Sequence, residues 1–197
     1  MDEYLSKALA KWPKVPAVYG WLALDRRGRW LLRGSPALNP ALVDYISRNY
    51  FSDSQGRWFF QNGPQRVYAD LDCTPFVHSL GGDGRLIAHT GSPVRALRKA
   101  WMDENGALIL GAEPGPGLML DRDLAALCEY LVDERDRPVD EEIFLRWMAD
   151  TDSPPDSRLG APPCRIRLAI QGARVDLARI HSARVASHFG FEAKPRP

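Results

Sequence analysis

Short stretches in which apolar and polar residues alternate, separated by turn residues, make up most of the chain. The first stretch, residues 18–24, is followed by Asp25-Arg26-Arg27-Gly28 and then by a second apolar stretch, residues 29–34. Aspartate at the first position of such a turn accepts hydrogen bonds from the turn's own amides, and glycine three positions later adopts the left-handed conformation of a bulge. This pattern predicts a β-hairpin, and similar patterns recur at residues 53–60, 83–87 and 103–110.

Apolar residues at helical spacing predict four helices along the chain. Residues 2–12 carry an apolar face and end at a proline. Asn39 is expected to cap a second helix that has Pro40 at its first position. Further helices are expected from about Asp121 and over residues 140–149.

The last part of the chain is predicted to be a loop followed by strands. Residues 151–163 are rich in proline, glycine and polar residues, which predicts a loop. Residues 165–170 and 174–180 are expected to form a hairpin about Gln171-Gly172. The tail is expected to add one edge strand near residues 183–191.

The chain contains an internal repeat. Residues 24–36 align with residues 102–114, with aspartate, glycine and proline at matching positions. A helix and a second strand pair follow each copy, so the order hairpin, helix, hairpin occurs twice. Chance similarity is the alternative, because turn physics alone dictates the turn residues. We predict an α+β fold of two related units, residues 1–85 and 86–197, with antiparallel sheets packed on short helices.

Composition and charge narrow the classes of function. The 197 residues carry 26 Lys and Arg against 25 Asp and Glu, a formal net charge of +1, so no global positive field favours nucleic acid or an anionic membrane. No apolar run approaches the ~20 residues that span a bilayer, and the first residues lack the order of a signal peptide. Cysteines are sparse, widely spaced and odd in number, which argues against a disulfide framework, so we expect a cytoplasmic protein.

Signatures of catalysis or metal binding are missing from the sequence. It contains no Cys-x-x-Cys or His-Glu-x-x-His spacing for a metal and no Gly-x-Ser-x-Gly elbow for a nucleophile. We therefore assign no catalytic residue, metal or cofactor. Strand aromatics beside arginines, as at Arg29-Trp30 and Arg57-Trp58, can stack single-stranded bases, but core packing is the favoured interpretation.

The candidate ligand-binding residues are polar groups at the ends of predicted strands. Arginine supplies affinity for an anion, and amide groups orient it. We expect a groove between the two units to bind a small anionic ligand. The residues expected to line it are Arg33, Gln61, Asn62, Gln65, Arg66 and His89. Two alternatives remain open: residues 61–66 are a turn whose side chains bond their own backbone, and His89-Thr90-Gly91-Ser92 is a polar loop linking the units.

Two other classes of function remain as alternatives to a non-enzymatic binding or regulatory module. A small hydrolase or isomerase would use His89 with a carboxylate such as Asp70 or Asp72, which requires a contact between them inside a pocket. A scaffolding subunit would associate through exposed hairpin edges, which would give a homodimer.

Several segments carry a resemblance to known proteins. They are residues 56–68, residues 19–25, the tripeptide His89-Thr90-Gly91 and the ending Phe189-Gly190-Phe191. Through these segments the chain resembles, over nearly its whole length, a proteobacterial family of about this size with no assigned function.

A weaker similarity links the chain to a second uncharacterised bacterial family. It rests on the order Trp30, Gly34-Ser35-Pro36, helix, Gly56-Arg57, strand and Pro75-Phe76. Members of that family have two repeated α+β units and have been proposed to act in ligand binding or signalling. The similarity implies the same architecture here and implies such a function by analogy.

Overall fold

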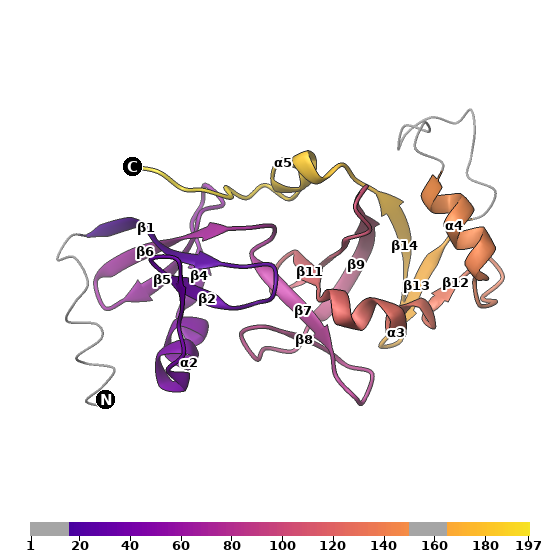
Figure 1. The fold of residues 1–197 in the computed structure, drawn as a ribbon, viewed down its shortest axis with the longest axis horizontal. Coiled ribbons are helices and arrows are strands. Elements are labelled where there is room, and N and C mark those ends of the chain that lie inside the picture. Colours follow the sequence, from indigo (N-terminus) through magenta and orange to yellow (C-terminus); the bar gives the residue numbers. More distant parts are fainter. Residues whose placement is uncertain (1–15, 150–164) are drawn as a thin grey trace. The chain divides into compact units, whose positions relative to one another are not determined.

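The structure is a computed structural model that describes residues 16–149 and 165–197. The helix predicted for residues 2–12 and the loop predicted for residues 151–163 lie outside the described residues. Runs of consecutive strands are interrupted by a few short helices along the described chain, which makes the fold α+β (Figure 1). None of the described helices is long and apolar enough to cross a membrane.

The strands form two mixed sheets. The six-stranded sheet has the order β3-β2-β1-β6-β5-β4, with the bounds β1 (Ala17–Leu24), β2 (Trp30–Leu32), β3 (Ser35–Pro36), β4 (Tyr50–Ser52), β5 (Trp58–Asn62) and β6 (Gln65–Leu71). The eight-stranded sheet has the order β12-β13-β14-β9-β10-β11-β7-β8, with the bounds β7 (Phe76–Leu80), β8 (Leu86–Ala88), β9 (Arg95–Met102), β10 (Leu108–Glu113), β11 (Gly117–Met119), β12 (Leu131–Val132), β13 (Arg167–Ile170) and β14 (Ala173–Arg179). The helices are α2 (Pro40–Arg48), α3 (Leu124–Cys128), α4 (Glu141–Ala149) and α5 (Val185–Phe189), with 3-10 turns at Asp121–Asp123 and Ser182–Arg184.

The two sheets repeat one topology. Strands β3-β2-β1-β6-β5-β4 correspond one to one, in chain order, to strands β11-β10-β9-β14-β13-β12, and the β7–β8 hairpin is additional. The central pair of each sheet is parallel, with Leu22 opposite Ala69 in one and Ala100 opposite Leu177 in the other. The predicted fold of two related hairpin–helix–hairpin units is confirmed. The parallel centre was not predicted, because it joins strands that are distant in the sequence.

Four aspartates begin turns of the same geometry. In each turn one carboxylate oxygen accepts hydrogen bonds from the amides two and four positions further on, at 2.8 to 3.0 Å. The turns predicted at Asp25, Asp53 and Asp103 are confirmed, each with a glycine of positive φ at its fourth position. The turn at Asp133 was not predicted, because its fourth position is Asp136, which adopts a φ of 58° where the others have glycine.

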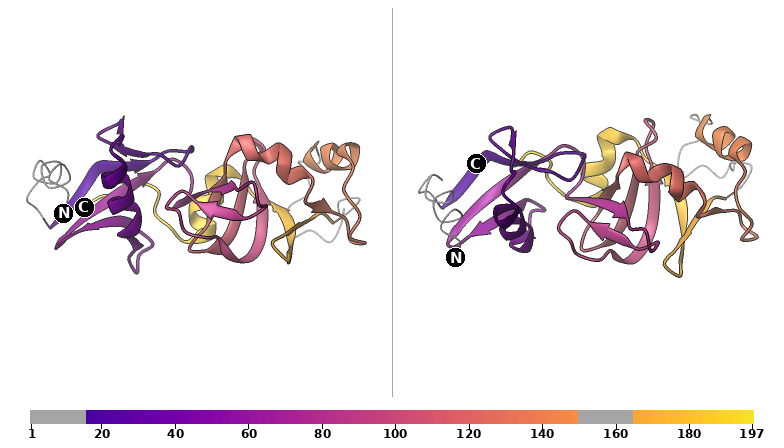
Figure 2. Two further views of the ribbon diagram at one scale, coloured as in Figure 1. Left: turned by 90° about the horizontal axis from the view of Figure 1, so that it is seen from below. Right: turned by 60° about the horizontal axis from the view of Figure 1, so that its bottom comes forward.

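Helix α2 begins where the sequence predicts and lies against one face of the six-stranded sheet (Figure 2). The Asn39 side chain accepts a hydrogen bond from the Leu42 amide at 3.0 Å, which satisfies one of the amides left open at a helix start. Pro40 is the first helical residue, and Leu42 and Ile46 are buried. The apolar stripe read from the sequence is therefore the face that packs on the sheet.

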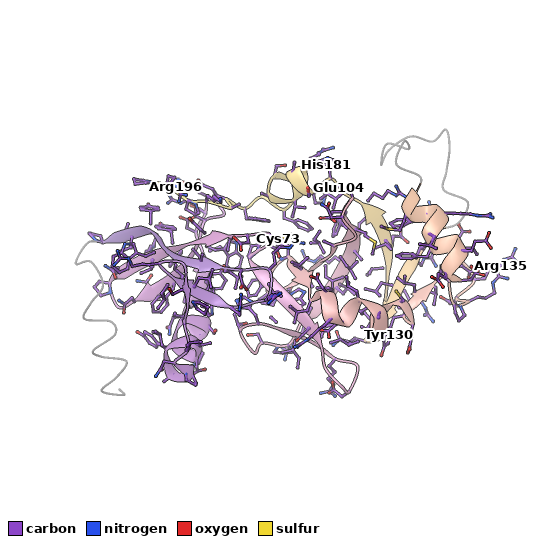
Figure 3. The ribbon with its side chains drawn as sticks, in the orientation of Figure 1. Cys73, Glu104, Tyr130, Arg135, His181 and Arg196 are labelled. Atoms are coloured by element: carbon purple, nitrogen blue, oxygen red, sulfur yellow. The ribbon has the colours of Figure 1, made fainter. Side chains whose placement is uncertain are left out.

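The C-terminal segment is helical where an edge strand was predicted, so that prediction is wrong. A 3-10 turn leads directly into α5. Glu104, from the β9–β10 turn, accepts hydrogen bonds from the Ser182 amide at 2.8 Å and the Ser182 hydroxyl at 2.5 Å, and His181 lies beside it (Figure 3). These bonds lower the pKa of Glu104 to about 2. A carboxylate at the start of the turn favours helix there, and no local pattern in the tail reveals it.

Contacts divide the chain into two compact units. The first unit comprises the described residues up to Phe76, together with His89–Gly91 and Ala186–Pro197, and the second comprises Val77–Ala88 and Ser92–Val185. This division differs from the expected boundary between residues 85 and 86, chiefly because the C-terminal segment returns to the first unit. There the Glu192 amide donates to the Gly56 carbonyl at 3.1 Å, and Arg196 pairs with Asp70 at 2.9 Å (Figure 3).

An aromatic cluster forms part of the core of the first unit. Its neighbouring ring centroids lie 4.9 to 6.2 Å apart, and its members are Trp30, Tyr50, Trp58, Phe76 and His89. Tyr50 is buried, and its hydroxyl has no hydrogen-bond partner within the described part of the chain. Burial raises the pKa of Tyr50 well above its usual value, so this hydroxyl stays protonated.

We expect Tyr50→Phe to raise the free energy of unfolding by about 1 kcal/mol, because it removes a buried hydroxyl that loses its hydrogen bond to water on folding. Chemical denaturation of the wild type and the variant measures the difference. Tyr45→Phe, at a half-buried position of α2, is the control and should change stability by less than about 0.5 kcal/mol. A clear loss of stability in Tyr50→Phe would contradict the account of the hydroxyl.

Candidate functional site

The face of the six-stranded sheet opposite α2 carries rings stacked under arginines. Phe60 faces the helix, with its ring 5.4 Å from that of Tyr45, so alternation along β5 points Phe59 to the other side. We call this surface the arginine–aromatic face, and it comprises Tyr19, Trp21, Arg33, Arg57, Phe59, Arg66 and Tyr68. The predicted residues Arg33 and Arg66 both lie on it.

Arg33 is positioned by the tight turn between β2 and β3. It adopts a φ of 50°, and Gly34 follows with a φ of 81°. The Arg33 amide donates to the Trp21 carbonyl at 2.8 Å, which places the two residues side by side on neighbouring strands. The Arg33 guanidinium then lies over the Trp21 ring, 4.8 Å from its centroid. Such a contact fixes the cation while leaving its outer side in water.

Arg66 lies near the start of β6 and, like Arg33, covers an aromatic ring. It pairs with Gln61 of β5, and its guanidinium lies over the Phe59 ring, 4.8 Å from the centroid. Both Arg33 and Arg66 are exposed, and neither forms an ion pair with a carboxylate of the described residues. Their charges are therefore ordered but not neutralised.

A third arginine on this surface differs in its charge balance. Arg57 lies over the Tyr68 ring at 4.8 Å but also pairs with Asp53 at 2.8 Å. The Tyr19 ring stacks on the Tyr68 ring, with the two centroids 4.7 Å apart and the two planes 4° apart. Because Asp53 compensates Arg57, the uncompensated positive charge of the face comes from Arg33 and Arg66.

Three of the predicted ligand-binding residues form hydrogen bonds within their own turn. The Gln61 side-chain amide donates to the carbonyl of Gly63 at 2.6 Å and to that of Gln65 at 3.2 Å. The Asn62 amide donates to the Gln65 side-chain oxygen at 3.4 Å. These bonds match the alternative in which residues 61–66 form a turn that bonds itself. Gln61 still lies on the same sheet face as Arg66, its partner across the strands.

His89 lies apart from the other predicted residues. Its ring contacts those of Trp30 and Phe76, at centroid distances of 5.0 and 5.7 Å. Trp30 pairs with Leu24 at the last residue of β1, whereas the Arg66 amide donates to the carbonyl of Pro16 just before β1. Trp30 also donates to the Ser47 hydroxyl of α2 at 3.0 Å, so His89 and its neighbouring rings lie on the helix side of the sheet. Arg33 and Arg66 lie on the opposite face, and they do not form one site with His89.

Asp70, one of the two carboxylates named in the catalytic alternative, has a structural role. Asp70 accepts two hydrogen bonds from the Arg196 guanidinium, at 2.9 and 3.4 Å. Within residues 16–149 and 165–197, no three histidine, cysteine or acidic side chains gather in a way that could hold a metal ion.

The ring partners of the arginines are the residues that sequence reasoning did not assign to the site. Trp21 and Phe59 were interpreted as core because aromatic residues in strands are usually buried, and Phe59 is indeed 6% exposed. The alternation of side chains along a strand could have indicated these residues. Tyr19 and Trp21 lie two residues apart and so share one face of the sheet, as do Trp58 and Phe60 on the other face. Which arginine covers which ring depends on strand register, which the sequence does not display.

The fold defines a two-unit α+β protein with a repeated mixed sheet. The chain belongs to the DUF2944 family, described as "Protein of unknown function (DUF2946)", whose model matches residues 1–196. This confirms the resemblance to a family without assigned function. No curated protein matches the chain.

Two solved structures, both of DUF1285 family proteins, are similar to this chain. The protein from Silicibacter pomeroyi DSS-3 has a TM-score of 0.52 and 17% identity, over 90% of this chain and 96% of its own. The protein from Shewanella baltica OS155 has a TM-score of 0.42 and 10% identity, over 54% of this chain and 89% of its own. The first of these similarities supports the fold and carries no information on function.

Proposed function

We propose that the protein is a non-enzymatic binding or regulatory module whose arginine–aromatic face binds a small anion that carries a planar ring. The observation that supports this is the pair of arginines, Arg33 and Arg66, each held over an aromatic ring without a carboxylate partner. The site lies within the first unit alone.

The chemistry of stacked guanidinium groups sets the class of ligand. One side of each guanidinium rests on Trp21 or Phe59, so the outer side and the N–H edge face solvent. A planar ring can stack on the outer side, and a carboxylate or phosphate can accept the N–H groups. Because the protein rings already order the arginines, binding costs less side-chain entropy than with free arginines.

We expect Arg33→Gln and Arg66→Gln each to weaken binding of 2-naphthoate about tenfold or more, since a hydrogen bond to a charged group contributes about 1.5–3 kcal/mol. Isothermal titration calorimetry measures the affinity. Arg26→Gln and Arg27→Gln are matched controls: both arginines are exposed in the first unit, and neither lies over a ring in the described structure. These two variants should bind 2-naphthoate as the wild type does.

A second probe separates the role of the ring from that of the charge. Cyclohexanecarboxylate has the same charge as 2-naphthoate but no aromatic face, so it should bind more weakly to the wild type and lose less in the two variants. The proposal is wrong if all four glutamine variants bind 2-naphthoate equally, or if the wild type does not bind it at millimolar concentration.

A further inference from the structure

The second unit presents the same sheet face with different chemistry. Aligning the parallel pairs β1–β6 and β9–β14 from the turns at Asp25 and Asp103 makes each residue of one sheet correspond to a residue of the other. The corresponding pairs on this face are Arg66 and Arg174, Trp21 and Lys99, Phe59 and Arg167, and Tyr68 and Asp176. The arginine of β6 is thus retained in β14, while the aromatic positions carry charged residues.

These charged residues surround an open depression in the second unit. It has a volume of about 350 Å³ and is lined by Arg98, Lys99, Arg167, Arg174, Val175 and Asp176. The lining residues come from three neighbouring strands, β9, β13 and β14. Four cationic side chains and one carboxylate therefore meet in one hollow of a chain whose formal net charge is only +1.

Acidic neighbours compensate the arginines only in part. Arg167 pairs with Asp176 at 3.3 Å and Arg98 with Glu113 at 3.4 Å, and Arg174 pairs with Asp136 at 3.0 Å in a separate contact. These are mostly exposed pairs, which are weak and exchange readily with another anion.

Lys99 is the cation of the depression without an acidic partner. Its ammonium lies 5.5 Å from the centroid of the Trp101 ring, and it forms no ion pair with the carboxylates in the described ranges. The ring holds the amine near the hollow, as the aromatic residues hold the arginines of the first unit.

We propose that this depression is a second ligand site, specific for a compact anion with several charges, of the diphosphate class. A multiply charged anion can contact Lys99 and Arg174 together and draw Arg167 away from Asp176. A monoanion gains little, because it would replace one weak ion pair by another. This inference extends beyond the proposed function, because it concerns a different unit and a different class of ligand.

Inorganic pyrophosphate is the probe that tests this site. We expect Lys99→Gln and Arg174→Gln to weaken its binding at least about fivefold, and we expect the wild-type affinity to fall steeply as sodium chloride rises from 0.05 to 0.5 M, as it does for contacts between exposed charges. Arg135→Gln is the matched control: Arg135 is exposed in the same unit and lies outside the depression (Figure 3).

Asp176→Asn provides a test that a damaged fold cannot imitate. It removes the one carboxylate of the depression and frees Arg167, so pyrophosphate should bind about fivefold more tightly. Arg33→Gln and Arg66→Gln should leave pyrophosphate binding unchanged, so the two sites can fail independently. Weaker or unchanged binding in Asp176→Asn, or an equal loss in Arg135→Gln, would overturn the proposal.

Discussion

Gly56→Ala is expected to lower the free energy of unfolding of the first unit by about 3–4 kcal/mol, because it combines a left-handed backbone with a backbone collision. Gly56 has a φ of 73°, and a β-carbon there would lie 2.1 Å from the Gly190 carbonyl oxygen and 3.0 Å from the Phe191 α-carbon. Neither backbone atom can rotate away as a side chain can. The variant should therefore release the C-terminal segment from the Asp53 turn.

Gly106→Ala separates the two effects, because it introduces the left-handed strain without the backbone collision. Gly106 occupies the same position of the equivalent turn in the second unit, with a φ of 78°, but a β-carbon there would meet nothing within 4 Å. It should cost only about 1–2 kcal/mol, the strain of the left-handed conformation. Hydrogen exchange over residues 190–197 together with chemical denaturation measures both effects. Equal losses in the two variants, with no faster exchange in Gly56→Ala, would contradict this account.

Stability is expected to fall by up to about 3 kcal/mol as the pH drops from 6.5 to 4, through protonation of His78. His78 is 0% exposed, and burial lowers its pKa to about 4 from the ordinary 6.5. Between pH 6.5 and 4 the unfolded chain therefore binds a proton at His78 that the folded chain does not bind. The contribution of His78 is complete above pH 6.5 and is lost progressively below it, with about 2 kcal/mol gone at pH 5.

His78→Leu is the variant that tests this titration. The unfolding free energy of the wild type minus that of the variant should fall by about 3 kcal/mol as the pH drops from 6.5 to 4. Hydrogen bonds hold the pKa values of Glu104 and Asp133 near 2 in the folded chain, so their contributions begin to be lost as the pH approaches their ordinary pKa values of 4.5 and 3.8. Both proteins carry these groups, so their effect cancels in the comparison. Parallel pH profiles for the two proteins would show that His78 does not carry the effect.

Local signals in the sequence predicted the elements that local physics determines. The aspartate turns followed from aspartate and glycine at fixed spacing, and helix α2 followed from Asn39 and Pro40. The turn at Asp133 escaped because Asp136 replaces the glycine. The parallel β1–β6 and β9–β14 pairs depend on contacts between strands distant in sequence, which no local pattern records.

The candidate site was only partly accessible to the same reasoning. Arg33 and Arg66 stand out as polar residues at strand ends, but their ring partners lie on other strands. Gln61, Asn62 and Gln65 are equally polar and instead bond within their own turn. Composition cannot separate these two uses of a polar side chain, because both place it at the end of a strand.

The basic depression was missed for a related reason. Arg98 is far in the chain from Arg167 and Arg174, which belong to one hairpin, and all three are surrounded by ordinary strand residues. The repeat offered the one signal, because aligning the two copies places Arg174 at the position of Arg66. Reading the repeat as a guide to function requires the strand register that the structure supplies.

The central claim is that one duplicated sheet face binds two classes of anion, one in each unit. Arginine side-chain N–H correlation spectra, recorded while 2-naphthoate and pyrophosphate are titrated separately, test it directly. We expect 2-naphthoate to shift the Nε–H signals of Arg33 and Arg66, and pyrophosphate to shift those of Arg167 and Arg174. Shifts of all four signals by both anions, or of none by either, would contradict the claim.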